Sequence, residues 1–346
     1  MSLLHYLPII IPSLLLHILS GEPAFAKVPA LFVFRDSTVD TGNNNFISTL
    51  VKSNFAPYGR DLRLANGNGQ ATGRFSNGRL AVDFISEAFG LPPYLDPDAN
   101  ISSLITGACF ASAGAGYDNA TSDIFSVLSV WKQLDYFKEY ASKLRSFVGE
   151  AKAQETLSEA LYIISMGTND FLENYYAVPR GHAAASDYAA YLVGVAESFA
   201  RALHALGARK LDLNGLPPMG CLPLERDSRK GACHEEYNSV ARSFNAGLRD
   251  LVARLDAGGA RVVYGDVYSG VADVVADPAA FGFEAIEVGC CGTTGRFEMG
   301  YLCNRASPLT CVDADKYAFW DAIHPTEHLH RIIAERKMNT TLYVFQ

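Results

Sequence analysis

The sequence lacks both an excess of basic residues and any long run of like charge. Its 346 residues include 29 lysines and arginines against 37 aspartates and glutamates, a formal net charge of −8. Because nucleic-acid-binding proteins usually present a basic face, this balance argues against nucleic acid as a partner. No low-complexity segment marks a disordered tail. Hydrophobic residues make up 49% of the chain, which is typical of a globular protein with a sizeable core.

Two catalytic patterns are also missing or incomplete. No serine has glycine two residues before and after it, so the nucleophile elbow of α/β-hydrolases is absent. No Cys-x-x-Cys pair supports a zinc site. His324 and His328 formally match the H-x-x-E-H pattern of one metalloprotease group. Pro325 should begin a helix, however, which leaves His324 at its edge in an awkward geometry for paired ligands. We therefore expect neither a metal nor a cofactor.

The N-terminal segment is apolar but is interrupted by Pro8 and Pro12, which argues against a stable membrane span. Its end, Ala24-Phe25-Ala26, fits the small-x-small pattern of a signal-peptidase site. The missing Lys or Arg at the start weakens this pattern, and a membrane anchor is the alternative. We predict a signal peptide at residues 1–26, a single domain at residues 27–346 and secretion through the endoplasmic reticulum.

The cysteines and glycosylation motifs agree with secretion. Six of the seven cysteines cluster late in the chain, and in a secreted protein this clustering predicts up to three disulfides of undetermined pairing. Cys109 lies in an apolar run and is predicted to be the odd, buried thiol. Asn-x-Ser/Thr motifs predict surface glycosylation at Asn100, Asn119 and Asn339.

Short apolar runs alternate with longer amphipathic segments along the chain. The runs predict strands that are buried on both faces of a parallel sheet, at residues 30–34, 108–112, 161–167, 208–215 and 260–266. Helical periodicity predicts helices at residues 79–90, 124–144, 187–207, 235–255 and 325–337. This alternation predicts an α/β fold, a three-layer α/β/α sandwich with a mainly parallel, doubly wound sheet.

Chemically useful residues follow the predicted strands, where ligands bind in such sheets. Ser37 follows the first strand, Gly114 the second and Asn169 the third, while Asp321 and His324 precede the last helix. A serine nucleophile needs a base such as imidazole, and the imidazole needs an acceptor on its other nitrogen. The backbone N–H groups of Ser37 and Gly114 and the Asn169 amide could bind an oxyanion. Each residue alone also fits a turn or a helix cap, so the prediction rests on their joint placement.

Several sequence blocks together resemble the plant-type GDSL esterase/lipase family of the SGNH hydrolase superfamily. They cover nearly the whole predicted mature chain, and they are "FVFRDSTVDTGNNN", "FAPYGRD", "ATGRFSNGR", "GACFASAGAG", "ISMGTNDF", "NGLPPMGCLP" and "FWDAIHPTE". The resemblance implies an extracellular carboxylic-ester hydrolase with an SGNH-hydrolase, flavodoxin-like fold and no cofactor. It implies Ser37 as nucleophile, His324 as base, Asp321 as its partner, and Ser37, Gly114 and Asn169 as oxyanion donors. The implied substrates are acyl esters of lipids, of cutin-like material or of cell-wall components.

The sequence departs from the family pattern at two positions near the predicted nucleophile and at one in the second block. Arg35 stands where the family has glycine, Thr38 where it has leucine, and Cys109 where the second block has asparagine. An arginine at a backbone position with positive φ would cost about 1 kcal/mol or more. Arg35 is therefore a predicted modulator, which could stabilise the oxyanion or occlude the acyl pocket. Two alternatives stay open: a non-catalytic secreted binding protein on the same fold, and an acyltransferase that uses the same acyl-enzyme.

Overall fold

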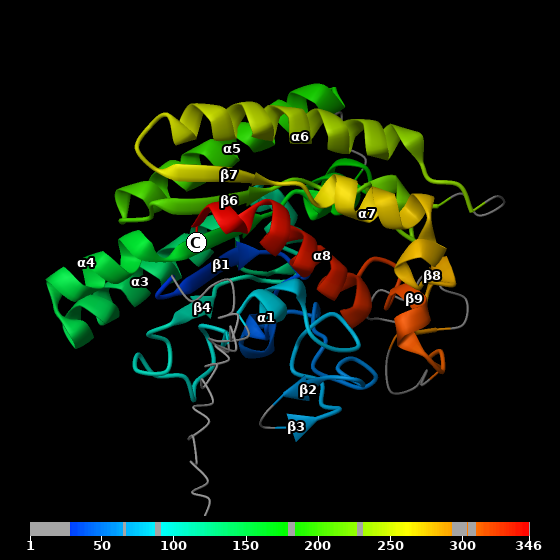
Figure 1. Ribbon diagram of the computed structural model, residues 1–346, viewed down its shortest axis with the longest axis horizontal. Coiled ribbons are helices and arrows are strands. Elements are labelled where there is room, and N and C mark those ends of the chain that lie inside the picture. The colour runs from blue at the N-terminus through cyan, green and yellow to red at the C-terminus, as the bar shows by residue number, and fades with distance from the viewer. Residues whose placement is uncertain are drawn as a thin grey trace, which may run out of the picture.

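A computed structural model of the chain describes residues 28–64, 67–86, 91–178, 184–226, 231–292, 303 and 309–345. The predicted signal peptide lies outside these residues. A central sheet runs through the described part of the chain, with helices packed on both of its faces (Figure 1). This arrangement confirms the predicted α/β sandwich.

Five parallel strands form the central sheet in the order β4-β1-β5-β6-β7. Their bounds are β1 Leu31–Arg35, β4 Gly107–Cys109, β5 Leu161–Ser165, β6 Lys210–Asn214 and β7 Arg261–Gly265. Each overlaps one of the five predicted strands, although β4 shares only residues 108 and 109 with the predicted 108–112. The chain adds β4 on one side of β1 and then returns to add β5 on the other side. The sheet therefore has its topological switch point at β1, where ligands bind in doubly wound folds.

Eight α-helices and two small strand pairs complete the described elements. The helices are α1 Ala81–Ile85, α2 Asn119–Phe125, α3 Val130–Val148, α4 Glu150–Glu159, α5 Ala185–Ala205, α6 Glu235–Asp256, α7 Val267–Ala276 and α8 Glu327–Thr340. The strand pairs are antiparallel β2 Arg63–Leu64 with β3 Gly67–Asn68, and parallel β8 Ala285–Gly289 with β9 Tyr317–Phe319.

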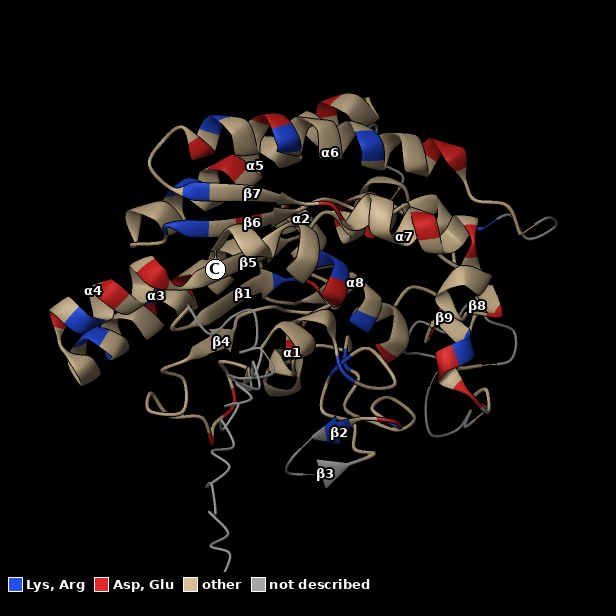
Figure 2. Cartoon of the chain, viewed as in Figure 1, with Lys and Arg blue, Asp and Glu red and all other residues tan. Residues whose placement is uncertain are grey.

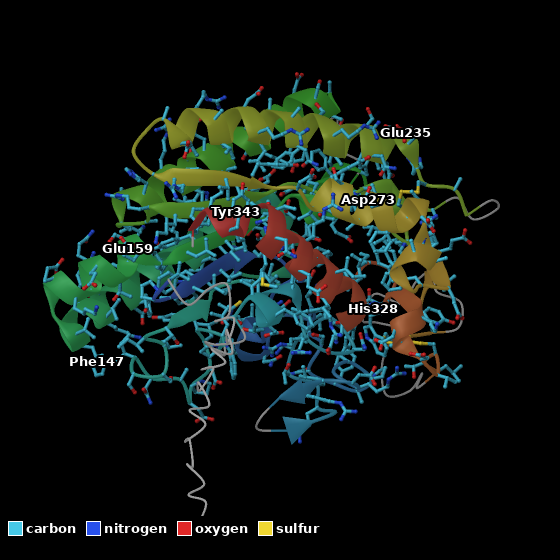
Figure 3. The ribbon with its side chains drawn as sticks, viewed as in Figure 1. Phe147, Glu159, Glu235, Asp273, His328 and Tyr343 are labelled. Atoms are coloured by element: carbon cyan, nitrogen blue, oxygen red, sulfur yellow. A yellow bond between two sulfur atoms is a disulfide. The ribbon has the colours of Figure 1, made fainter. Side chains whose placement is uncertain are left out.

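Alternating side chains of β1 enter two separate cores. Phe32 and Phe34 pack on the face covered by α3, α5 and α6, where the Phe34 ring stacks on Phe110 with 5.2 Å between centroids. Leu31 and Val33 point to the opposite face, which α1 and α8 cover (Figure 1). This period-two alternation sends Arg35, two residues after Val33, toward the face of α8. Side chains fill the space between the sheet and both helical layers (Figure 3).

Three predicted helices had wrong bounds. The helix predicted at residues 79–90 is the short α1, which begins at Ala81 and ends at Ile85. The other two differ for local reasons. The predicted helix at residues 124–144 is divided into α2 and α3, because Ser126 takes a left-handed conformation with φ 53°. Ser129 then caps α3 by accepting a hydrogen bond from the backbone N–H of Lys132. The last helix begins at Glu327 rather than Pro325, since the Thr326 side chain supplies its N-cap.

The outer helices carry charges of both signs. Lysines and arginines alternate with aspartates and glutamates along α3, α4 and α6, and no broad region of one sign is visible in this view (Figure 2). No helix among the described residues combines the length and hydrophobicity needed to cross a membrane.

Candidate active site

A tight corner after β1 holds the predicted nucleophile. Asp36 shapes it, because its Oδ1 accepts hydrogen bonds from the backbone N–H (3.0 Å) and the hydroxyl (2.8 Å) of Thr38. Ser37 lies at the apex with only 7% of its surface exposed. Its Oγ is 2.8 Å from Nε2 of His324, which comes from a segment 287 positions later in the chain.

The segment before α8 orients His324 through one carboxylate. Nδ1 of His324 is 2.7 Å from Oδ2 of Asp321, and Oδ1 accepts the backbone N–H groups of Ile323 (2.9 Å) and His324 (2.7 Å). Because a carboxylate only accepts hydrogen bonds, it places the imidazole proton on Nδ1 and leaves Nε2 free to accept from Ser37. The predicted Ser37, His324 and Asp321 therefore lie in one continuous hydrogen-bonded line.

Tyr58 is a neighbour of this line that the sequence reasoning missed. Its hydroxyl donates a 2.8 Å hydrogen bond to Oδ2 of Asp321, and the side chain is fully buried. Burial and the negative charge of Asp321 raise the pKa of Tyr58 well above its usual value, so it remains a donor. The tyrosine belongs to the "FAPYGRD" block, but nothing in that block indicates a partner 263 residues away.

Three residues of the "VDTGNNN" loop fasten the Ser37 corner to the segment after β4. The Asn43 amide donates to the carbonyls of Cys109 and Ala111, both at 2.8 Å. The Asn44 amide donates to the Ala113 carbonyl at 3.0 Å, and Asp40 accepts the Ala113 backbone N–H at 3.1 Å. We call Asp40, Asn43 and Asn44 the loop clamp.

The loop clamp is buried, and this has an electrostatic cost. Burial raises the pKa of Asp40 to about 6, against four backbone N–H groups that favour its ionised form. The sequence alone indicated only a turn-rich loop here. The polar side chains of the loop clamp form hydrogen bonds with the backbone at and after the end of β4 rather than with solvent.

Gly114 and Gly116 meet different requirements in the segment that follows β4. Gly114 has φ +84°, a conformation that favours glycine, and a Cβ there would meet the Phe125 ring at 3.2 Å. At Gly116, a Cβ would lie 2.2 Å from a carboxylate oxygen of Asp170. Gly116 thus allows close packing against Asp170.

Asn169 follows β5, and its side chain contacts the segment that carries Gly114. Its Nδ2 donates to the Ala115 carbonyl at 3.0 Å, beside Gly114. Its neighbour Asp170 is fully buried and accepts hydrogen bonds from the backbone of Tyr117 (2.7 Å) and the hydroxyl of Thr121 (2.6 Å). Burial raises the pKa of Asp170 to about 7. These contacts fix the position of Asn169 relative to Gly114.

Four of the predicted site residues line one cavity of about 250 Å³, and the fifth, Asp321, adjoins it through His324. Its polar wall contains Ser37, Gly114, Asn169, Glu173 and His324. The pKa of Glu173 is raised because burial outweighs the opposing effect of the nearby His324. The rest of the wall is mainly apolar and is formed by Leu50, Val51, Phe55, Phe75, Phe125 and Ile323, with Lys52 beside them.

Arg35 lies outside this cavity. It is the last residue of β1 and pairs with Ser165 in regular strand register, and among the described residues other than glycine only Ser126 has a positive φ. The exchange of the family glycine for arginine therefore needs no left-handed backbone. Its side chain lines a second, smaller cavity beneath α7 and α8. The sequence suggested that Arg35 could stabilise the oxyanion or occlude the acyl pocket. Its place outside the first cavity supports neither role.

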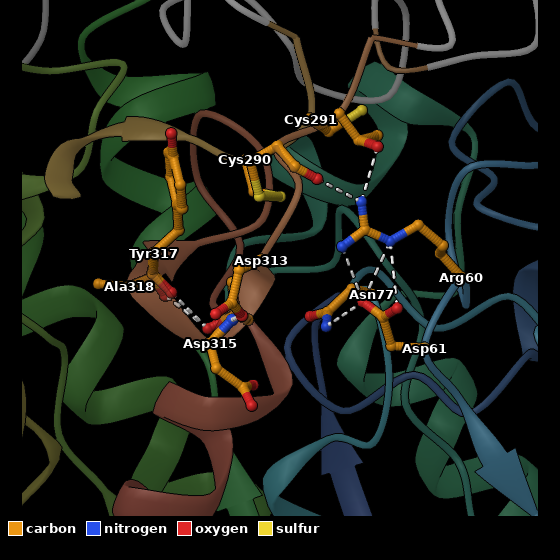
Figure 4. The surroundings of a disulfide bond; sticks show 12 residues. Arg60, Asp61, Asn77, Cys290, Cys291, Asp313, Asp315, Tyr317 and Ala318 are labelled. Carbon is orange, nitrogen blue, oxygen red and sulfur yellow. Dashed lines mark hydrogen bonds and ion pairs between the residues drawn. A yellow bond between two sulfur atoms is a disulfide. The ribbon is translucent and has the colours of Figure 1, made fainter. Parts of the chain in front are cut away.

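Three disulfides link the six late cysteines, as Cys221–Cys233, Cys290–Cys311 and Cys291–Cys303, and confirm the predicted number. Cys109 is the free, buried thiol, as expected. The backbone N–H groups of Cys290 and Cys291 donate to the carbonyls of Phe319 and Trp320, just before Asp321. Arg60 lies beside these cysteines and donates to the Cys311 carbonyl at 2.8 Å (Figure 4). The disulfides thereby support the segment that carries Asp321 and His324.

The remaining predicted residues are distant from the cavity or differ in role. Asn100, Asn119 and Asn339 are all exposed, as glycosylation would require, and their modification stays a prediction. His328 is on α8, and its Nδ1 contacts the Asp315 carbonyl at 2.7 Å. Because His324 is bonded to Ser37 and Asp321, the two histidines of the H-x-x-E-H match have separate partners.

Comparison with known proteins gives one family. A model of the GDSL-like lipase/acylhydrolase family matches residues 31–336. Three GDSL esterase/lipases of Arabidopsis thaliana are 52%, 50% and 49% identical to the chain. The alignments cover 93%, 93% and 96% of the chain, and 93%, 94% and 96% of the relatives. These matches confirm the predicted resemblance and the predicted enzyme class, a carboxylic-ester hydrolase. By sequence and by the match over residues 31–336, the chain belongs to the GDSL-like lipase/acylhydrolase family.

Proposed function

We propose that the protein hydrolyses carboxylic esters with Ser37 as nucleophile, His324 as general base and Asp321 as the group that orients the base. The observation that carries this proposal is the line from Ser37 Oγ to His324 Nε2 (2.8 Å) and from His324 Nδ1 to Asp321 Oδ2 (2.7 Å). As Oγ attacks the ester carbonyl, Nε2 takes its proton, and the carboxylate of Asp321 stabilises the imidazolium. The imidazolium then protonates the departing alcohol, and water attacks the acyl-enzyme with the same base.

The proposed oxyanion donors come from three strand ends. They are the backbone N–H groups of Ser37 and Gly114 and the side-chain amide of Asn169, which all line the same cavity. Preorganised donors of this kind stabilise the charge that develops in the transition state. The loop clamp supports the proposal, since it ties the Ser37 corner to the segment that carries Gly114.

We further propose that the apolar wall of the cavity receives the acyl chain of a lipid or cell-wall ester. Phe55, Phe75, Phe125 and Ile323 supply an apolar surface beside Ser37, and such surface favours hydrocarbon over a charged acyl group. Leu50 is 83% exposed at the same cavity, so the apolar surface continues outward to solvent.

A fluorophosphonate probe tests the nucleophile directly. The wild-type protein should be labelled covalently, and Ser37→Ala should not be labelled, because the probe reacts only with an activated serine hydroxyl. Arg35→Gly is the matched comparison, and it should be labelled like the wild type, since Arg35 lies outside the cavity. Labelling that appears only after Arg35→Gly would contradict the proposal and support the non-catalytic alternative.

We also propose that the protein is secreted. Three disulfides and three exposed glycosylation motifs fit an oxidising, extracellular destination. The mature N-terminus, determined by mass spectrometry after expression in plant cells, should be Lys27, directly after the predicted cleavage site. A mature protein that retains Met1 would contradict this.

A further inference from the structure

A second cavity lies behind the Ser37 corner, on the side of α7 and α8. It has a volume of about 60 Å³ and is lined by Arg35, Thr168, Ile323 and His330, among others. Asp36 and Thr38 border it, whereas Ser37 between them borders the first cavity. Ile323 lines both spaces. The two cavities therefore lie on opposite sides of the corner that carries Ser37.

Two buried nitrogen atoms of residues that line the second cavity have no hydrogen-bond partner among the residues that the structure describes. They are Nε of Arg35 and Nε2 of His330. Within the described residues, no carboxylate forms an ion pair with the Arg35 side chain. Buried polar groups are nearly always hydrogen-bonded, and the Nε–H of Arg35, which can only donate, therefore indicates a missing acceptor at this cavity.

The charges around Arg35 favour an anion as that acceptor. Lys337 on α8 is already paired with Asp212 and also donates to Asn214. Asp36 uses its Oδ1 to accept the N–H and the hydroxyl of Thr38. Burial lowers the pKa of the Arg35 guanidinium, although Asp36 and Asp212 oppose that change. A group that brings its own negative charge would therefore stabilise the ionised guanidinium.

The remaining wall limits the anion to one with a short apolar body. Leu216, Leu222, Val271, Phe319, Leu329 and Ile333 surround the space. A single water needs about 10–15 Å³ of such volume, so about 60 Å³ corresponds to roughly four to six heavy atoms. Carboxylates match the planar fork of a guanidinium, and a short alkyl chain matches the apolar wall.

We propose that this cavity is a binding site for a small aliphatic monocarboxylate, with Arg35 as the residue that holds its carboxylate. Such acids are also products of short-chain ester hydrolysis, but the site is separate from the proposed active site and does not depend on its chemistry. The alkyl end lies against Val271 and Leu329, from α7 and α8.

Calorimetric titration of sodium butyrate into the Ser37→Ala protein tests the site without turnover. Ionic strength is held constant with sodium chloride, and matched titrations use sodium chloride and sodium phosphate. We expect saturable binding of butyrate and none of either inorganic anion. Arg35→Gln in the same background should weaken butyrate binding at least about tenfold, because it removes a charge-assisted pair of hydrogen bonds. Unchanged binding in Arg35→Gln, or equal binding of phosphate, would overturn the proposal.

Two further variants distinguish binding at this site from binding in the first cavity, and a loss of the site from a loss of folding. Lys52→Gln removes the lysine of the first cavity and should leave butyrate binding unchanged. Val271→Phe fills the second cavity from α7 without altering Arg35 and should abolish binding. Loss of binding in Lys52→Gln with retention in Val271→Phe would place the acid in the first cavity and overturn the proposal. Fluorophosphonate labelling of the Ser37-containing forms of these variants reports independently on the proposed esterase.

Discussion

Replacing Ser37 with alanine should lower kcat for a p-nitrophenyl ester by about a thousandfold or more, and His324→Ala should do the same. Each substitution removes one end of the 2.8 Å hydrogen bond through which the hydroxyl loses its proton. Because the two residues act as one unit, the double variant should lose no more than either single variant. Steady-state kinetics with purified proteins at matched concentrations measures all three variants. Circular dichroism checks that each variant is folded.

His328→Ala is the matched control for this experiment. His328 is the other histidine of the H-x-x-E-H match and contacts the Asp315 carbonyl instead of Ser37. Its removal should change kcat by less than about threefold, as is usual for residues outside a site. A large loss in His328→Ala, or losses in the Ser37 and His324 variants that multiply in the double variant, would contradict the proposed roles.

Asn169→Ala should lower kcat by about a hundredfold to a thousandfold, with little change in KM. The amide lies beside Gly114 and faces the cavity, where it can donate to an oxyanion that exists only in the transition state. An interaction made only in the transition state affects kcat and kcat/KM equally. Steady-state kinetics on a short-chain ester gives both parameters.

A structural role for Asn169 predicts a different result. Asn169 is the N-cap of a short π-helical turn, Asp170–Tyr175, which contains Asn174. The Asn174 amide bonds to the Tyr188 hydroxyl at 3.1 Å, and Asn174 does not line the cavity. Asn174→Ala should therefore reduce stability and leave kcat within about tenfold. If Asn169→Ala instead raised KM alone, or lost less than tenfold in kcat, Asn169 would not be an oxyanion donor.

The sheet could be predicted from sequence because its strands are buried on both faces and read as continuous apolar runs. The helices were harder, since their signals are weaker. In α4, only Ala153, Thr156 and Leu157 are buried, so its sequence carries little periodic hydrophobicity. The turn between α2 and α3 depends on Ser126 in a left-handed conformation, which is unusual for serine.

At the site, the sequence identified which residues follow the strands but not what holds them together. Ser37, Gly114, Asn169, Asp321 and His324 all line or adjoin one cavity, as the strand-end rule predicts. The contacts of the loop clamp and of Tyr58 join residues 66 to 263 positions apart, and one sequence carries no signal for such pairs.

The direction of the Arg35 side chain is another feature that the sequence did not predict. Two-residue alternation along β1 places its side chain on the same face as Val33, away from the first cavity. In the sequence, Arg35 replaces the family glycine two residues before Ser37, and this position suggested a role at Ser37 alone. What the Arg35 side chain contacts depends on which helices cover that face of the sheet. The packing of α8 determines this, and the local sequence around Arg35 does not indicate it.

The loop clamp has a consequence for how heat should inactivate the enzyme. Many active-site loops open locally at free energies well below that of global unfolding, so activity is lost first. Here Asp40, Asn43 and Asn44 are buried and bonded to backbone groups of Cys109, which ends β4, and of Ala111 and Ala113, which follow it. Opening the Ser37 corner would therefore break buried hydrogen bonds to the backbone that leaves the sheet at β4. Thermal inactivation and loss of secondary structure should then occur in a single cooperative transition.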